Sequence, residues 1–121
     1  MILSILASLT IPMSGVVTQG IRPHHQAIDI ACMVGEPIYA AHDGVGRGTR
    51  SHTHGNTFIL LRSDGLETRY SHMDTMKPTG SYKVGDQIGT CGNTGSLSTG
   101  PHLHFEASNL SVLNFLYNPS Y

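Results

Sequence analysis

Residues 100–106 read Gly-Pro-His-Leu-His-Phe-Glu, a turn signal followed by strict alternation of polar and apolar residues. On a β-strand, successive side chains point to opposite faces of the sheet. Leu103 and Phe105 are therefore expected to pack into a core. The polar residues are expected to share the other face: His102, His104 and Glu106. Two same-face positions lie roughly 7 Å apart along a strand, so this strand is expected to line a cleft with imidazoles.

Other short runs of β-branched or alternating residues recur between Gly, Pro, Asn and Asp along the chain. They lie at residues 15–18, 28–31, 37–41, 57–62 and 67–72. No sustained helical period occurs, and the one helix expected, over 110–116, ends at Asn118-Pro119. With fourteen Gly and six Pro among 121 residues, the pattern predicts an all-β protein.

The length and net charge of the chain argue against several classes of protein. A chain of 121 residues is expected to form one domain over residues 1–121. Charged residues make up only 12% and the net charge is −1, which argues against a coiled coil, a charged disordered tail and a nucleic-acid binder. The apolar stretch Met1–Ile11 is much shorter than a membrane span, and we expect a first strand or a packed N-terminal arm.

Two local patterns predict how the strands connect. Ser63-Asp64-Gly65 separates two strand-like runs, and Asp-Gly predicts a hairpin with a tight primed turn. Val34-Gly-Glu-Pro-Ile resembles Val84-Gly-Asp-Gln-Ile, fifty residues later. We interpret this faint repeat as two similar segments at related positions of a sheet sandwich; a chance match between glycine-rich strands remains the alternative.

Cys32 and Cys91 occur in no CxxC or CxxH pair, so they are not expected to bind zinc. Two cysteines are also too few for a disulfide-stapled scaffold. A single disulfide and two free buried thiols are both compatible with the sequence, and we favour free thiols.

Histidine is unusually frequent, with eight residues against seven Lys plus Arg. His25 and Asp29 would lie roughly 13 Å apart on a fully extended strand, so a shared ion requires His25 to lie on a loop that folds back. Simple alternation puts His72 on the same face as Thr68 and Tyr70. Histidines and an aspartate from separate strands suit a zinc site, which uses three protein ligands and leaves one position to water.

The order of these motifs resembles the lysostaphin-type (LytM-like) zinc endopeptidases. The resemblance runs from about residue 12 to 119 and rests on His25-x-x-x-Asp29, His54-Gly-Asn, Tyr70-Ser-His72 and Thr99-Gly-Pro-His102-Leu-His104. It implies a small antiparallel β-sandwich (a barrel-sandwich hybrid) with an open substrate groove. It also implies hydrolysis of peptide bonds in bacterial peptidoglycan, in cross-links or stem peptides.

The resemblance further implies that one Zn²⁺ is held by His25, Asp29 and His104. His72 and His102 are implied to flank the catalytic water. We assign His102 as the general base and His72 to the oxyanion or the leaving amine; the reverse order is compatible with the sequence. The expected partners are peptidoglycan peptides and a larger virion or cell-envelope assembly, without nucleic acid or a membrane span. The expected location is extracytoplasmic or virion-associated.

The chain departs from the family pattern in two places. Ala27 replaces the Gly that is common between the first histidine and the aspartate, and the loop from Arg22 to His25 is short. We expect the short loop to open the groove. Because only the spacing to Asp29 favours His25, His24 is an alternative ligand.

Other polar residues have weaker interpretations. Glu106 is expected either to orient a zinc ligand or to be solvated, and Tyr70 to pack. Three histidines near turns are expected to be exposed, with His54 possible at the groove rim: His42, His52 and His54.

Two rival functions follow from the same sequence. A non-catalytic module of this fold would bind wall peptide within a virion or the cell-division machinery. A biotinyl-lipoyl-like or sugar-phosphotransfer carrier is suggested by the Val-Gly-acid repeats. A lipoyl-type carrier needs a modified lysine in a tight turn, and the two lysines, Lys77 and Lys83, do not lie in one.

Overall fold

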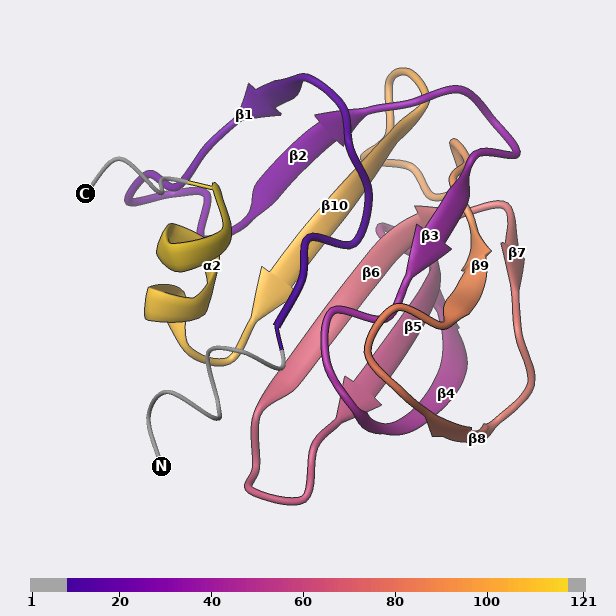
Figure 1. Cartoon of the computed structure of the whole chain (residues 1–121). Coiled ribbons are helices and arrows are strands. Elements are labelled where there is room, and N and C mark those ends of the chain that lie inside the picture. Colours follow the sequence, from indigo (N-terminus) through magenta and orange to yellow (C-terminus); the bar gives the residue numbers. More distant parts are fainter. Residues whose placement is uncertain (1–8, 118–121) are drawn as a thin grey trace.

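A computed structural model describes residues 9–117, which form two antiparallel sheets and one helix (Figure 1). The larger sheet has seven strands in the order β1-β2-β10-β6-β5-β4-β8, and the smaller has three in the order β3-β9-β7. The strands are β1 (Val17–Gln19), β2 (Ile28–Ala31), β3 (Pro37–Tyr39), β4 (Gly44–Ser51), β5 (Gly55–Leu61), β6 (Glu67–Met73), β7 (Thr75–Met76), β8 (Gly80–Tyr82), β9 (Gln87–Thr90) and β10 (His102–Ala107). The predicted all-β sandwich is confirmed.

The hydrophobic core lies between the two sheets. Phe58, Tyr70 and Phe105, from three neighbouring strands of the large sheet, are fully buried. Ile38 and Ile88 face them from the small sheet and are equally buried. Helix α2 (Leu110–Tyr117) packs beside β10 through Leu113 and ends one residue beyond the predicted range. The other face of the seven-stranded sheet is open and carries the functional side chains.

The repeat over residues 34–38 and 84–88 forms a pair of matching turns. Gly35 and Gly85 have φ angles of 98° and 86°, a region that glycine adopts without steric cost. Each turn leads into a strand, and these strands, β3 and β9, pair antiparallel with Ile38 opposite Gly89. The two segments therefore occupy related positions, as predicted.

The hairpin between β5 and β6 is confirmed, but its turn is not the predicted primed type. The Arg62 amide donates to Leu66 O (2.8 Å) and the Gly65 amide to Arg62 O (3.0 Å), enclosing a three-residue loop. Gly65 has φ 98° while Asp64 does not have a positive φ. A three-residue loop needs only one residue in the left-handed region, and Gly65 provides it.

Residues 1–8 of the N-terminal stretch lie outside the described residues. Within 9–11 no strand forms, although the Thr10 amide donates to Ala41 O at 2.9 Å. Among residues 9–117, no helix is long and apolar enough to cross a membrane.

Candidate metal centre and active site

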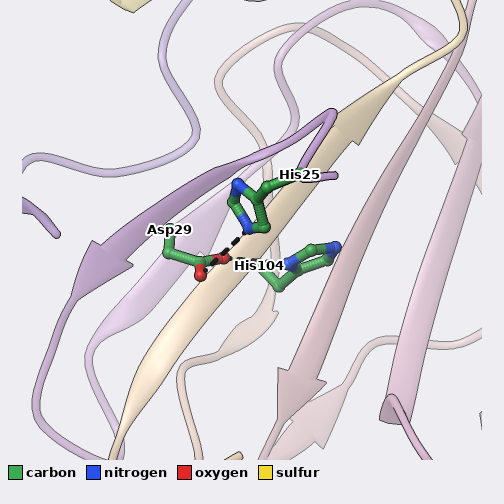
Figure 2. Close-up of side chains that lie close together, drawn as sticks. All are labelled: His25, Asp29 and His104. Atoms are coloured by element: carbon green, nitrogen blue, oxygen red, sulfur yellow. Dashed lines mark hydrogen bonds and ion pairs between the residues drawn. The ribbon is translucent and has the colours of Figure 1, made fainter. Parts of the chain in front are cut away.

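The three predicted zinc ligands, His25, Asp29 and His104, converge on the open face of the large sheet (Figure 2). Asp29 lies on β2 directly opposite His104 on β10, and His104 lies opposite Ser71 on β6. The alternation expected for residues 102–106 is confirmed, because Leu103 and Phe105 are fully buried on the core face. The centre of the sheet therefore supports the site.

A tight turn brings His25 to this face. The amides of Arg22 and His25 each donate to the other residue's carbonyl, at 2.8 and 2.9 Å, around Pro23-His24. His25 Nε2 then lies 3.2 Å from Asp29 Oδ2, whereas His24 is exposed. The chain thus folds back as the spacing required, and the alternative ligand His24 lies outside the cluster.

His104 is held between two carboxylates. Its Nδ1 lies 2.8 Å from Asp29 Oδ1 and its Nε2 2.8 Å from Glu106 Oε2. Burial lowers the pKa of His104, but the hydrogen bonds with Asp29 and Glu106 outweigh it and raise this pKa to about 9. Burial conversely raises the pKa of Asp29, and the His104 hydrogen bond brings it below its usual value. Glu106 therefore orients His104, one of its two expected roles.

The donor atoms of His25, Asp29 and His104 fit a divalent metal. One ligand atom from each lies within 4.8 Å of the others. His25 Nε2 is buried without a hydrogen-bond partner among the described residues, an arrangement that is costly unless another group binds it. Two imidazole nitrogens and one carboxylate oxygen form a donor set typical of catalytic metal sites.

His72 reaches the cluster by a route that simple alternation does not predict. The β5–β6 pairing shifts register, since Asn56 pairs with Met73 but Phe58 with Tyr70. His72 has φ 63°, the one positive φ of a non-glycine residue within 9–117. This irregularity turns the ring away from the core face of Tyr70, so the expected common face of His72 with Thr68 and Tyr70 is wrong. The left-handed conformation costs roughly 1–2 kcal/mol in a residue with a Cβ atom.

Backbone carbonyls orient the rings of His72 and His102. Nδ1 of His72 lies 2.6 Å from Thr94 O, and Nδ1 of His102 lies 2.8 Å from Gly100 O. The ring centroids are 4.7 Å apart, and His102 Nε2 lies 4.0 Å from Asp29 Oδ1. Because a carbonyl only accepts, each Nδ1 carries the proton and each Nε2 is left for other partners.

His25 shows the same arrangement, because its Nδ1 donates to Gly20 O at 2.9 Å. In His104 it is Nε2 that donates outward, to Glu106. All four rings are thus fixed by an acceptor outside the cluster, as is usual for metal-binding and catalytic histidines.

His54 is the site residue that the sequence placed only at the rim. Its ring stacks on His72 at 5.8 Å and lies 5.3 Å from that of His104. His54 Nε2 is also 4.0 Å from Glu106 Oε2. The sequence feature that could have identified His54 as a site residue is Gly55, which follows it. Gly55 has φ 65°, and β5 begins there, directly after His54. The His54 carbonyl accepts from the His72 amide, which places the two histidines side by side.

The prediction of an exposed His42 is wrong. His42 is fully buried, with Nδ1 2.7 Å from Asp43 O and Nε2 2.8 Å from Thr68 Oγ1. Thr68 in turn contacts the Tyr70 hydroxyl at 2.7 Å. Burial lowers the pKa of His42, so the ring is neutral in the core. Tyr70, fully buried, packs as expected.

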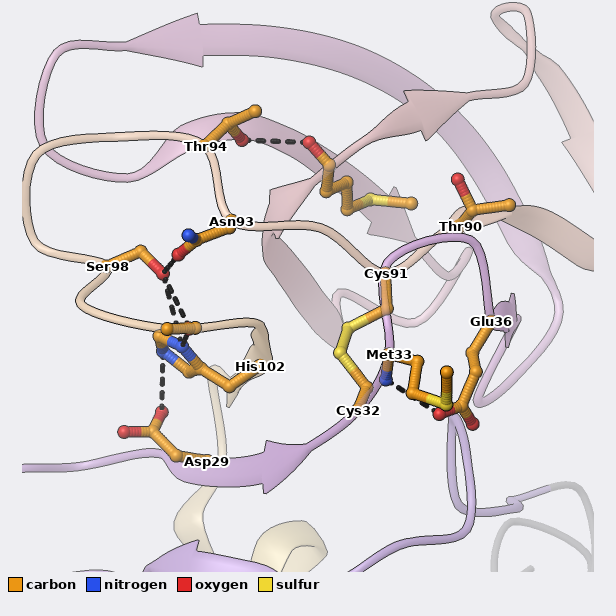
Figure 3. The surroundings of a disulfide bond; sticks show 12 residues. Asp29, Cys32, Met33, Glu36, Thr90, Cys91, Asn93, Thr94, Ser98 and His102 are labelled. Atoms are coloured by element: carbon orange, nitrogen blue, oxygen red, sulfur yellow. Dashed lines mark hydrogen bonds and ion pairs between the residues drawn. A yellow bond between two sulfur atoms is a disulfide. The ribbon is translucent and has the colours of Figure 1, made fainter.

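The favoured prediction of free thiols is also wrong, because Cys32 and Cys91 form a disulfide (Figure 3). Cys32 follows β2, which carries Asp29, and Cys91 follows β9. The disulfide thereby ties the Asp29 strand to the start of the segment 92–101, which carries the carbonyls that orient His72 and His102. Sequence could not reveal this closeness, because the two cysteines are 59 residues apart.

A cavity lies on each side of the cluster. One, of about 370 Å³, is lined by Asp29, His102, Leu97 and residues 99–101. The other, of about 360 Å³, lies over β4, β5 and β6 and is lined by His54, Glu106 and three arginines. The histidine cluster thus lies in the middle of an open groove, as the fold prediction anticipated.

A sandwich of this topology with a histidine-aspartate cluster on its open sheet is the architecture of a metallopeptidase. Residues 23–114 match the family model described as peptidase family M23. The chain therefore belongs to peptidase family M23, in agreement with the predicted lysostaphin-type resemblance.

A curated relative and two solved structures that resemble this chain are also peptidases. The chain is 40% identical over 93 residues to the peptidoglycan DD-endopeptidase ShyA of Vibrio cholerae, covering 74% of this chain and 21% of ShyA. A zinc-containing peptidase from Vibrio cholerae aligns with TM-score 0.77 at 30% identity, over 83% of this chain and 36% of that one. The catalytic domain of lysostaphin from Staphylococcus simulans aligns with TM-score 0.64 at 28% identity, over 90% of both chains. The chain spans about a fifth of the length of the curated relatives that it matches.

Proposed function

We propose that this chain is a zinc-dependent endopeptidase that hydrolyses peptide bonds in bacterial peptidoglycan. The observation that carries the proposal is the convergence of His25, Asp29 and His104 beside the carbonyl-anchored rings of His72 and His102. Family M23 membership and a relative named as a peptidoglycan DD-endopeptidase support the same substrate.

His25, Asp29 and His104 are proposed to hold the zinc. Nitrogen donors from imidazole suit zinc, whereas calcium and magnesium prefer more oxygen ligands. When bound, zinc supplies Lewis-acid chemistry: it lowers the pKa of a water towards neutrality and polarises the scissile carbonyl. Gly20 O holds the His25 ring and Glu106 holds the His104 ring, so both imidazole ligands are oriented before metal binds.

His102 is proposed to act as the general base. Its Nδ1 proton is committed to Gly100 O, so the Nε2 lone pair of the neutral ring is free to accept a proton from water. Asp29 Oδ1, 4.0 Å from that Nε2, stabilises the imidazolium that forms. The ring then returns the proton to the leaving amine.

His72 is proposed to stabilise the oxyanion or the departing amine. Burial lowers the pKa of His72, and the neighbouring histidines lower it further, although the Thr94 hydrogen bond raises it. The ring is therefore neutral at pH 7 and accepts through Nε2. Its ring lies 4.7 Å from that of His102 between centroids. His72 donates to an oxyanion only when it carries a second proton, which must come from solvent because the proton that His102 accepts from water goes to the leaving amine.

The proposed place of action is outside the cytoplasm, at the cell wall or on a virion. Peptidoglycan lies there, and the Cys32–Cys91 disulfide is a bond that persists in oxidising compartments. An open groove admits a branched, cross-linked peptide from either end.

A zinc assay joined to wall lysis tests the proposal. Purified protein is expected to bind about one zinc per chain and to clear a suspension of cell walls. A chelator should stop clearing and added zinc should restore it. Clearing that survives His104→Ala, or a protein that binds no zinc, would overturn the proposal. Wall binding without clearing would instead indicate the non-catalytic module.

A further inference from the structure

The groove is electrically asymmetric about the histidine cluster. Of the chain's five arginines, three line the cavity over β4, β5 and β6: Arg47, Arg50 and Arg69. The cavity on the other side, beside His102, includes no lysine or arginine in its lining and contains Asp29. In a chain with only seven Lys plus Arg, this is a marked concentration of positive charge.

The charge in this cavity is not neutralised by the protein. Arg69 pairs with Glu67 at 2.9 Å, and the Glu106 carboxylate is committed to His104 at 2.8 Å. Arg47 and Arg50 make no ion pair or side-chain hydrogen bond with any residue between 9 and 117. Two guanidinium groups therefore face the cavity without a carboxylate partner.

The strand that carries these arginines is fixed against the core. β4 pairs with β5 through Arg47 and Arg50 to Ser51, and with β8 only over Gly44–Gly46, so the pairing with β5 fixes the backbone at both arginines. Gly46 and Gly48 alternate with Arg47, and a Cβ atom at either position would collide with Phe58 or Met76. The inward positions are thus closed to side chains, and Arg47 projects from a fixed backbone.

The cavity is continuous with the proposed reaction centre. Its lining includes Glu106, which orients His104, and His54, whose ring lies 5.3 Å from that of His104. A peptide that lies across the histidine cluster therefore passes within reach of the arginines.

We propose that Arg47 and Arg50, with Arg69 beside them, bind a free carboxylate of the peptide substrate and so fix its direction in the groove. Guanidinium and carboxylate match each other in planar, bidentate hydrogen bonds. The inference rests on the proposed peptidase function and deepens it: the substrate class is a peptide with a carboxylate on the β4–β6 side of the scissile bond.

Two forms of one substrate test the inference. Cross-linked wall peptides, purified after glycan digestion, are supplied with their carboxylates free or converted to carboxamides. Zinc-loaded wild-type protein is expected to cleave the free-carboxylate form with a kcat/KM about tenfold higher or more. This ratio should fall towards one in Arg47→Gln/Arg50→Gln and as salt concentration rises. Lys77→Gln/Lys83→Gln removes two charges as well, from exposed positions outside the cavity, and should keep the ratio.

The outcomes separate the two proposals. If wild type cleaves both peptides equally well, the carboxylate site is wrong while the peptidase function stands. If neither peptide is cleaved, the peptidase function fails, and calorimetric binding of the same peptides decides the carboxylate site. Tighter binding of the free-carboxylate form, lost in the double variant, would support it; equal binding would overturn it. Zinc content and thermal unfolding establish that each variant is folded.

Discussion

The Nδ1 atom of His72 lies 2.6 Å from the carbonyl oxygen of Thr94, and this hydrogen bond holds a residue whose own backbone is in the left-handed region at φ 63°. Strained residues of this kind cluster at active sites, where the surrounding structure maintains them. Here the strain redirects a side chain from the core to the groove. The Thr94 carbonyl then fixes the ring's orientation.

The backbone at His72 can be tested separately from its ring. Asn tolerates the left-handed region, whereas a β-branched residue does not. His72→Asn should therefore lie within about 1 kcal/mol of wild type in free energy of unfolding, and His72→Val should lose roughly 1–2 kcal/mol more. Denaturant unfolding measures both. Both variants should lose wall-clearing activity, and equal stability of the two would argue against strain at this residue.

The two histidines of β10 are expected to have separable roles. His102→Ala should keep about one zinc per chain and lose roughly 10²–10⁴-fold in rate. His104→Ala should lose the zinc itself, because it removes one of three proposed ligands. Metal analysis after gel filtration compares them directly. Loss of zinc from His102→Ala would show that the roles within the pair are misassigned.

The disulfide should stabilise both the fold and the groove. Cys32→Ala/Cys91→Ala opens a loop of 59 residues, for which a loss of about 2–4 kcal/mol in free energy of unfolding is expected. The variant should still bind zinc, since no ligand changes, but kcat/KM should fall because segment 92–101 carries the carbonyls that orient His72 and His102. Unchanged stability in the double variant would contradict this role; treating wild type with a reductant provides a mutation-free comparison.

The buried His42 should make the protein sensitive to acid. Its folded-state pKa lies below the ordinary 6.5 because of burial. Above pH 6.5 both states are neutral and the full stability is present; as pH falls below 6.5, the unfolded state takes up a proton first and stability is lost. His42→Asn should be less stable at pH 7.5, yet its free energy of unfolding should decline less between pH 6.5 and 5. A decline as steep as that of wild type would assign the acid sensitivity to other groups.

Structural features that depend on residues close together in the sequence could be predicted. Alternation in residues 102–106 predicted the strand, its core face and its groove face, and the spacing of His25 and Asp29 predicted that His25 lies on a loop that folds back. It missed β4 because glycines at 44, 46 and 48 weaken the strand signal, although these glycines are required by the close approach of neighbouring atoms at Leu61, Phe58 and Met76. The predictions for His42 and the cysteines failed for a different reason: burial and disulfide pairing depend on contacts distant in sequence.

The direction of the His72 side chain could not be predicted from periodicity. Two-residue alternation holds through most of β6, then fails at the register shift. Its site role was implied by family resemblance, and the backbone geometry that produces it appears only in the folded chain.

This chain is proposed to cut peptide bonds in peptidoglycan. The most direct test of this proposal is the count of new chain ends after zinc-loaded protein digests purified sacculi. We predict new free amino groups without new reducing sugar ends, and none with His102→Ala that retains zinc. Intact cross-links after digestion with zinc-loaded wild type, with the protein bound to the sacculi, would contradict the proposal.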